Sequence, residues 1–323
     1  MLTQNVFDLD GAKECERIGD WLRQALRRDL HRHGIVVALS GGVDSSVCAA
    51  LAARALGVGK VLALLLPERD SSPHSTRLGR LVAEQLGIEW ILQDITPALE
   101  AIGCYSRRDE AIRAVLPDYA ADWKSKIAIR GGLEGRINHF VLVVETPAGA
   151  VREQRLGPRE YLQIVAATSY KQRLRKAIEY FHADRLHYAV LGTPNRLEYD
   201  QGFFVKNGDG AADLKPIAHL YKTQVYALAR FLGLPEEICA AQPTTDTYSM
   251  TQGQDEFYFG LPYADMDLAL WGHDHGLPAA ELGRALGMEP QQAELVYRDI
   301  ERKRGTTAYL HASPRLAAPD LGG

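Results

Sequence analysis

The sequence predicts an α/β protein with a parallel sheet that is covered by helices on both faces. Short runs at residues 35–39, 61–66 and 90–92 are apolar at every position, which is typical of strands buried on both sides. Apolar residues recur at three- and four-residue steps in 18–30 and 78–86, which indicates amphipathic helices, and a further helix is expected over 46–56. Because parallel neighbours need a helical crossover, this alternation favours a parallel sheet.

Residues 124–156 break this rhythm. Two extended runs, 140–145 and 151–156, flank a turn with proline before glycine, so an inserted β-hairpin is expected at about residues 137–156. A long helix is expected from Tyr161, a strand at 188–191 and a helix at 222–232 that is ended by glycine and proline. We predict one domain over residues 1–304, whose last helix ends at Arg304, and a C-terminal tail over residues 305–323.

Composition and charge limit the function classes. The chain has 323 residues, of which 46% are apolar, and a net charge of −4, which argues against a general nucleic-acid surface. Its apolar runs are far shorter than the ~20 residues that cross a bilayer, and its start lacks the apolar core of a signal peptide. Four scattered cysteines without a CxxC pair argue against a zinc site or a disulfide framework. We expect a cytoplasmic protein with neither nucleic acid nor membrane as a partner.

The segment Ser40-Gly-Gly-Val-Asp-Ser-Ser46 joins the first strand to a helix. Its glycines let a ligand approach the backbone, and N–H groups at a helix N-terminus bind anions. Three serines add hydroxyl donors, and Asp44 supplies a carboxylate for a metal that bridges phosphate oxygens. The segment is neither a GxxxxGK[ST] loop nor a GxGxxG loop. The alternative interpretation is a Gly-Gly turn whose serines cap the helix.

This segment resembles the pyrophosphate-binding loop of the ATP pyrophosphatase superfamily, whose fold is adenine nucleotide alpha-hydrolase-like. Four later segments narrow the resemblance to NAD synthetases: 191–198, 202–210, 213–217 and 220–224. The resemblance runs from about Gly34 to Thr245, and more loosely to Lys303. It implies a ligase that uses ATP to adenylate a carboxylate and then aminates it with ammonia. The implied reaction converts deamido-NAD to NAD and releases AMP and pyrophosphate.

The resemblance also implies a role for individual residues. The ATP site would comprise Ala38, Leu39, Ser40, Gly41, Gly42, Val43, Asp44, Ser45, Thr193, Lys222 and Thr244. Mg²⁺ would be held by Asp44 and Glu198, and the acceptor by Arg173, Lys206, Asp213, Arg302 and Lys303. Asp44 and Lys222 would be catalytic, because carboxylate-bound metal and a lysine both neutralise charge on leaving pyrophosphate. Glu198 could instead be a solvated loop acid, the threonines simple caps, and Arg302 and Lys303 a basic helix end.

Partners follow from the same resemblance. Residues 67–73 resemble the nucleotide-side loop of glutamine-dependent NAD synthetases, but the pyrophosphate loop begins at residue 40, which leaves no room for an amidase domain before it. The nitrogen would therefore come from free ammonia or from a separate glutaminase. The resemblance further implies a homodimer whose acceptor site uses both chains.

Three departures from the family pattern keep other functions open. The hairpin at 137–156 is an insertion, an aromatic run over 244–259 replaces the usual ending, and Arg302 stands where histidine is expected. One alternative is the same chemistry on another acid, such as a sugar acid or a secondary metabolite. A remote alternative is a nucleotide-responsive DNA-binding protein, since 281–304 loosely resembles a helix-turn-helix. We predict that the hairpin lies at the rim of the acceptor site.

Overall fold

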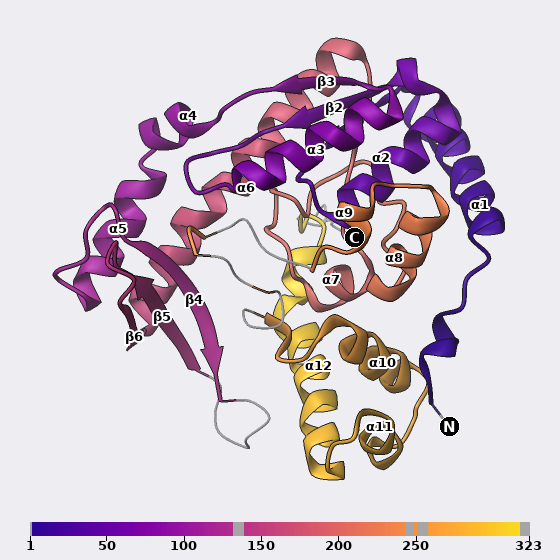
Figure 1. Cartoon of the computed structure of the whole chain (residues 1–323). Helices are drawn as coiled ribbons and strands as arrows, with labels where there is room; N and C mark the ends of the chain where they lie inside the picture. Colours follow the sequence, from indigo (N-terminus) through magenta and orange to yellow (C-terminus); the bar gives the residue numbers. More distant parts are fainter. Residues whose placement is uncertain (1, 132–138, 243–247, 251–252, 254–257, 317–323) are drawn as a thin grey trace, which may run out of the picture.

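The computed structural model describes residues 2–131, 139–242, 248–250, 253 and 258–316 (Figure 1). Its centre is a sheet of four parallel strands in the order β3-β2-β1-β7. The strands are β1 (Ile35–Ala38), β2 (Val61–Leu65), β3 (Glu89–Leu92) and β7 (Ala189–Leu191). The predicted parallel sheet is thus confirmed.

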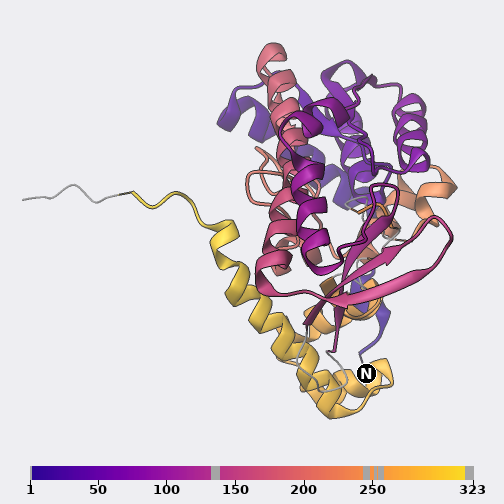
Figure 2. The same cartoon turned by 90° about the vertical axis from the view of Figure 1, so that its left-hand side faces the viewer.

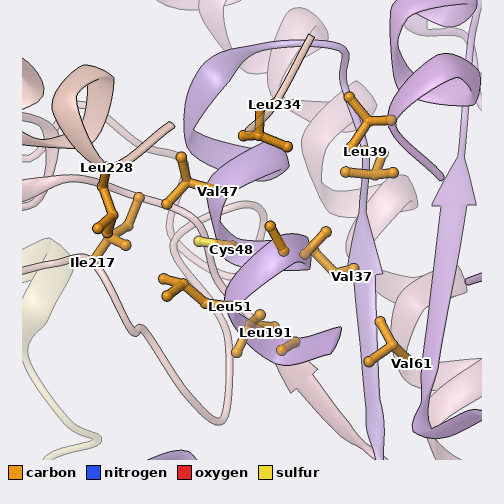
Figure 3. Close-up of a cluster of buried hydrophobic side chains, with 14 of the residues drawn as sticks. Val37, Leu39, Val47, Cys48, Leu51, Val61, Leu191, Ile217, Leu228 and Leu234 are labelled. Atoms are coloured by element: carbon orange, nitrogen blue, oxygen red, sulfur yellow. The ribbon is translucent and has the colours of Figure 1, made fainter. Parts of the chain in front are cut away.

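Alternate residues of each strand point to opposite faces of the sheet, and both faces are covered by helices. Val37, Ala63 and Leu191 pack on one face with residues of α1, α2, α3, α8 and α9, and Figure 3 shows the centre of this cluster around Cys48 and Leu51. The helices of this face are α1 (Gly11–Gln24), α2 (Val43–Leu56), α3 (Pro73–Leu86), α8 (Lys222–Phe231) and α9 (Glu236–Cys239). The predicted helix at 18–30 is the end of α1 and a π-helical segment, Ala25–Leu30.

The opposite face is covered by three helices. Val36, Leu64 and Val190 pack there with residues of α4 (Thr96–Ala101), α5 (Cys104–Val115) and α6 (Pro158–Leu186). The short helix α7 (Arg196–Gln201) follows β7, and 3₁₀ turns occupy Gln4–Phe7 and Val58–Lys60.

The predicted hairpin is confirmed, and a third strand that the sequence did not predict extends it to a three-stranded antiparallel sheet. β5 (His139–Glu145) pairs with β6 (Val151–Arg155) and, on its other side, with β4 (Lys124–Arg130). Leu142 and Val144 pack on one side of β5, Val141 and Val143 on the other. A lone ribbon would leave an apolar face in water; here residues of α5 and α6 cover the Leu142 face, and Met250 packs on the Val141 face. We call β4–β6 the antiparallel sheet.

The C-terminal part is a group of three helices with its own core. α10 (Tyr263–Asp274), α11 (Ala279–Leu286) and α12 (Pro290–His311) share a cluster that includes Leu268, Leu282 and Ile300. The predicted end of the last helix at Arg304 is wrong, because α12 continues without interruption to His311 (Figure 2), while the domain boundary at residue 304 stays a prediction. Within the described residues, no helix is both long and apolar enough to span a bilayer.

Candidate active site

A cavity of about 1680 Å³ opens at the carboxyl ends of the parallel strands. The loops after β1, β2 and β7 meet there, and α6, α12 and the antiparallel sheet supply further walls. The chain leaves β1 toward β2 on one side, whereas β7 lies on the other side of β1. Ligands of open α/β sheets bind at such a reversal of strand order.

The loop after β1 carries most of the predicted ATP-site residues. Ala38, Leu39, Ser40, Gly41, Gly42, Val43, Asp44, Ser45 and Thr193 all line the cavity. Gly41 has φ +80, and a Cβ there would collide with the carbonyl oxygen of Ser75, so the position requires glycine. The hydroxyls of Ser45 and Ser46 donate to the Gly42 carbonyl over 3.1 and 2.8 Å. These are bonds within the first turn of the helix. Gly42, at the cap position of α2, has no side-chain cap bond, so the alternative interpretation that the serines cap the helix is wrong, and Ser45 lines the cavity.

Two carboxylates and a lysine from three helices meet beside this loop. The Nζ of Lys222, at the start of α8, pairs with the Asp44 carboxylate of α2 and lies 3.9 Å from Oε1 of Glu198 in α7. Lys222 is 2% exposed. Burial alone lowers the pKa of this lysine, but Asp44 and Glu198 reverse the effect and raise it above its ordinary value. The lysine is therefore a permanent cation in the cavity wall.

Neighbouring side chains hold this cluster in position. Asn195 donates to Asp44 over 3.0 Å and forms a reciprocal capping box with Glu198 at the start of α7. The pattern Asn-Arg-Leu-Glu is the sequence signature of such a box, so the capping box at the start of α7 could have been predicted. Asp267 in α10 accepts bonds from the backbone N–H groups of Lys222 and Thr223. Burial raises the pKa of Asp267 to about 6.

The predicted acceptor residues Arg173, Lys206, Arg302 and Lys303 line the cavity from α6, the loop after α7 and α12. Lys303 donates to the Tyr258 carbonyl and pairs with Asp299, each over 2.6 Å. Burial lowers its pKa in spite of this pairing. Arg302 is exposed and pairs with the same Asp299 over 2.5 Å.

Two predicted residues have other surroundings. The Asp213 carboxylate accepts the backbone N–H of Val190 in β7 over 2.7 Å and the Tyr180 hydroxyl over 3.2 Å. It does not line the cavity, so here it holds the end of the sheet, and a role in acceptor binding stays a prediction. Thr244 lies outside the described residues.

A buried ionic network beside the cavity was missed by sequence reasoning. Lys171 of α6, which is 1% exposed, pairs with Glu68 over 3.0 Å and with Asp70 over 2.7 Å. Arg108 of α5 pairs with the same Asp70 over 2.6 Å. The network fixes the loop at 67–73, whose Ser71 lines the cavity, onto α5 and α6. Its members are too far apart in the sequence to form a motif.

The antiparallel sheet reaches the cavity, as predicted for the inserted segment. Ile129, Arg130 and Gly131 at the end of β4 and Phe140 of β5 line it. The Phe140 ring stacks on Tyr161 of α6, with ring centroids 4.0 Å apart. The sheet therefore forms one wall of the site, and its influence on acceptor recognition stays a prediction.

Comparison with known proteins identifies the family. The NAD synthase family model matches residues 14–120 and 136–305. The chain belongs to the NAD synthase family. All of β4 and the turns of α12 after residue 305 fall outside the match, whereas β5 and β6, which we expected to be an insertion, fall within it.

Relatives within this family extend over nearly the whole chain. An NH3-dependent NAD+ synthetase of Rhizobium meliloti is 57% identical over 320 residues, which cover 99% of this chain and 96% of the relative. Another from Mesorhizobium japonicum is 59% identical, with 96% and 97% covered. The NH3-dependent NAD synthetase structure from Campylobacter jejuni has the same fold, with a TM-score of 0.62 at 21% identity over 96% of this chain and 100% of that one.

Proposed function

We propose that this protein is an ammonia-dependent NAD synthetase that converts deamido-NAD to NAD with ATP. Two relatives named for this activity match it over almost their full length, at 57% and 59% identity. The observation that carries the proposal within the site is the cluster of Asp44, Glu198 and Lys222 beside the glycine-containing loop. Such a cluster suits a reaction in which charge develops on departing pyrophosphate.

The phosphate side of the site is formed by α2 and α8. The first residues of α2 line the cavity, and the N–H groups at a helix N-terminus favour an anion. Asp44 and Glu198 would hold Mg²⁺, because both carboxylates lie around the Lys222 ammonium and supply the hard oxygens that this ion prefers. Bound Mg²⁺ would neutralise phosphate charge. Within the described residues no group of three or more acidic, His or Cys side chains is placed to hold a metal ion.

Lys222 acts where the leaving group accumulates charge. The acceptor carboxylate attacks the α-phosphorus of ATP, forming an oxygen–phosphorus bond while the bond to the β-phosphate oxygen breaks. The electron pair of that bond stays on pyrophosphate. Because Lys222 is buried and already fixed by Asp44 and Glu198, little reorganisation is needed for it to meet this charge.

The second step makes the amide. Ammonia attacks the acyl carbon of the adenylate, a carbon–nitrogen bond forms, and AMP leaves with the electrons of the carbon–oxygen bond; the amine then loses a proton. A free carboxylate would be a poor electrophile for this attack, whereas the acyl adenylate has a good leaving group. We propose that Arg173, Lys206, Arg302 and Lys303 hold the anionic acceptor, since all four line the same cavity.

Neither alternative function gains support from an observation. Arg302 pairs with Asp299, and Arg304 pairs with Asp200 and Asp274, so the basic end of the helix-turn-helix-like segment is neutralised by acids. Arginines that are already paired with acids are poorly suited to binding the phosphates of a DNA backbone. No contact in the described cavity singles out a sugar acid or another metabolite.

Assembly, nitrogen source and location are part of the proposal. We propose that the protein uses free ammonia, since relatives that cover almost the whole chain are named NH3-dependent NAD+ synthetases. A homodimer in the cytoplasm, which the family resemblance implies, is also part of the proposal. A separate glutaminase would instead make turnover with glutamine depend on an added protein. Light scattering and assays with ammonium or glutamine test the two points.

The test is pyrophosphate release from ATP and Mg²⁺ with ammonium and a set of acids. Deamido-NAD should be used with the highest kcat/KM, and NAD should form in equal amount to AMP. Nicotinate mononucleotide and sugar acids serve as competing acceptors. If the kcat/KM for one of these acids is tenfold or more above that for deamido-NAD, that acid is the substrate instead. Release of pyrophosphate without any acid would overturn the amide-ligase assignment.

A further inference from the structure

The last turn of α12 contacts a residue of the acceptor side. Lys206 Nζ donates to the Tyr309 carbonyl over 2.6 Å and to the Ala312 carbonyl over 3.1 Å. Its ammonium also lies 5.2 Å from the centre of the Tyr309 ring. Figure 2 shows this end of α12 extending beyond the three-helix group that holds its start.

These carbonyls are suited to a cation. The last four C=O groups of a helix have no partner within the helix, and they carry the negative end of its dipole. An ammonium group has three donors, so two bonds to carbonyls leave one N–H for another acceptor. Lys206 lines the cavity, so the remaining donor can reach a ligand there.

The turn is fixed to the body of the protein by side chains on both sides. His311 lies against the rings of Tyr199 and Phe204, with centroids 4.8 and 5.1 Å away. Thr307 packs so closely on Gly202 that a Cβ at Gly202 would overlap it. Thr306, Thr307, Tyr309 and Leu310 line the cavity themselves. The turn is therefore a wall of the site and not a loose end.

We propose that residues 306–312 are a positioning element for acceptor binding, which holds the Lys206 ammonium in place for an anionic group of the acceptor. This element lies beyond residue 305, where the match to the family model ends. The inference rests on the proposed function for the identity of the acceptor, but the contact between the turn and Lys206 can be tested without activity.

The first experiment compares the full chain with two truncations. One ends at Ala308 and removes both carbonyls; the control ends at Leu316 and keeps them. Loss of a charge-assisted contact should raise the acceptor KM about tenfold in the shorter variant, with kcat and the KM for ATP within twofold of the parent. Lys206→Met should raise the acceptor KM by at least as much. If the turn acts through Lys206, the combined variant has the KM of Lys206→Met alone.

An unchanged acceptor KM in the folded Ala308 truncation would overturn the inference. So would a combined variant whose fold-increase in acceptor KM equals the product of the increases in the truncation and in Lys206→Met. If the truncation does not fold, Tyr309→Gly with His311→Gly frays the same turn at full length and decides in its place.

The second experiment needs no turnover. Acylation of Lys206 by a small amine-reactive ester, followed by peptide mass spectrometry, should be several-fold faster in the Ala308 truncation than in the Leu316 control. Equal labelling would overturn the contact itself. If labelling differs but the acid preferred by the full chain is not deamido-NAD, the proposed function fails while the positioning element stands, and the KM comparison is made with the preferred acid.

Discussion

Replacing Lys222 by methionine should separate leaving-group stabilisation from simple ATP binding. Methionine keeps the length of the buried side chain but leaves Asp44 and Glu198 facing each other without a cation. Losing one preorganised electrostatic group costs ~10²–10³ in kcat. We expect this loss in kcat for pyrophosphate release, with a smaller change in the KM for ATP.

The same substitution should destabilise the protein. Breaking a buried ion pair costs about 3–5 kcal/mol, and the lower end applies here because Asp44 keeps 16% of its side chain exposed to the cavity. Denaturant unfolding measures this cost. Mg²⁺ should restore part of the stability, since a cation between the two carboxylates replaces the missing ammonium.

Two control variants distinguish the loss of the Lys222 charge from a general loss of stability as the cause of the lower kcat. Lys222→Arg keeps the charge and should retain more activity than Lys222→Met. Thr223→Val removes a hydroxyl bond of 2.8 Å to Asp267 and leaves the cavity intact, so it should lower stability by about 1 kcal/mol with kcat nearly unchanged. A Lys222→Met enzyme with the parent kcat and only a raised KM for ATP would refute the role in leaving-group stabilisation.

Three further predictions follow from the same structure. Asp44→Asn should fold but lose most turnover, and a rate within a few-fold of the parent at limiting Mg²⁺ would remove Asp44 from the ligand set. Burial raises the pKa of Asp267 to about 6, so the folded state holds that proton more strongly than the unfolded chain. Stability should therefore fall by about 2 kcal/mol between pH 4 and pH 7, and Asp267→Asn should lack this component in urea unfolding. Phe140→Ala should raise the acceptor KM several-fold with the KM for ATP unchanged. The control Val151→Ala, at a residue of β6 that is 59% exposed, should change neither KM. An acceptor KM in Phe140→Ala equal to that of the parent would show that the antiparallel sheet takes no part in acceptor recognition.

The parallel sheet and its phosphate loop could be predicted because their signals are local. Strands β1 and β2 are buried on both faces, so they consist of uninterrupted apolar runs. The loop after β1 needs glycine at Gly41, where φ is positive and Ser75 approaches, and this requirement is visible in the sequence itself.

β4 and the end of α12 were missed for physical reasons. β4 reads Lys-Ser-Lys-Ile-Ala-Ile-Arg, and charged residues at both ends hide an interior that is buried only in contact with β5. α12 continues past Gly305 and two threonines, all weak helix formers, because Thr307 packs on Gly202 and His311 packs on the Tyr199 ring. In both cases tertiary contacts overrode local preference.

On the acceptor side of the cavity, the positively charged side chains of Lys206, Arg302 and Lys303 already have hydrogen-bond or ion-pair partners within the protein. Lys206 is held by helix carbonyls, Lys303 by a carbonyl and Asp299, and Arg302 by the same carboxylate. At Arg302 and Lys303 an anionic acceptor must therefore compete with Asp299, so the net gain from each of these two cations is smaller than for a lysine facing only solvent. Lys206 keeps one donor for the acceptor. Discrimination among acids then depends on walls that fix where the cations point. Those walls are the antiparallel sheet and the last turn of α12, the two segments that lie partly outside the family match.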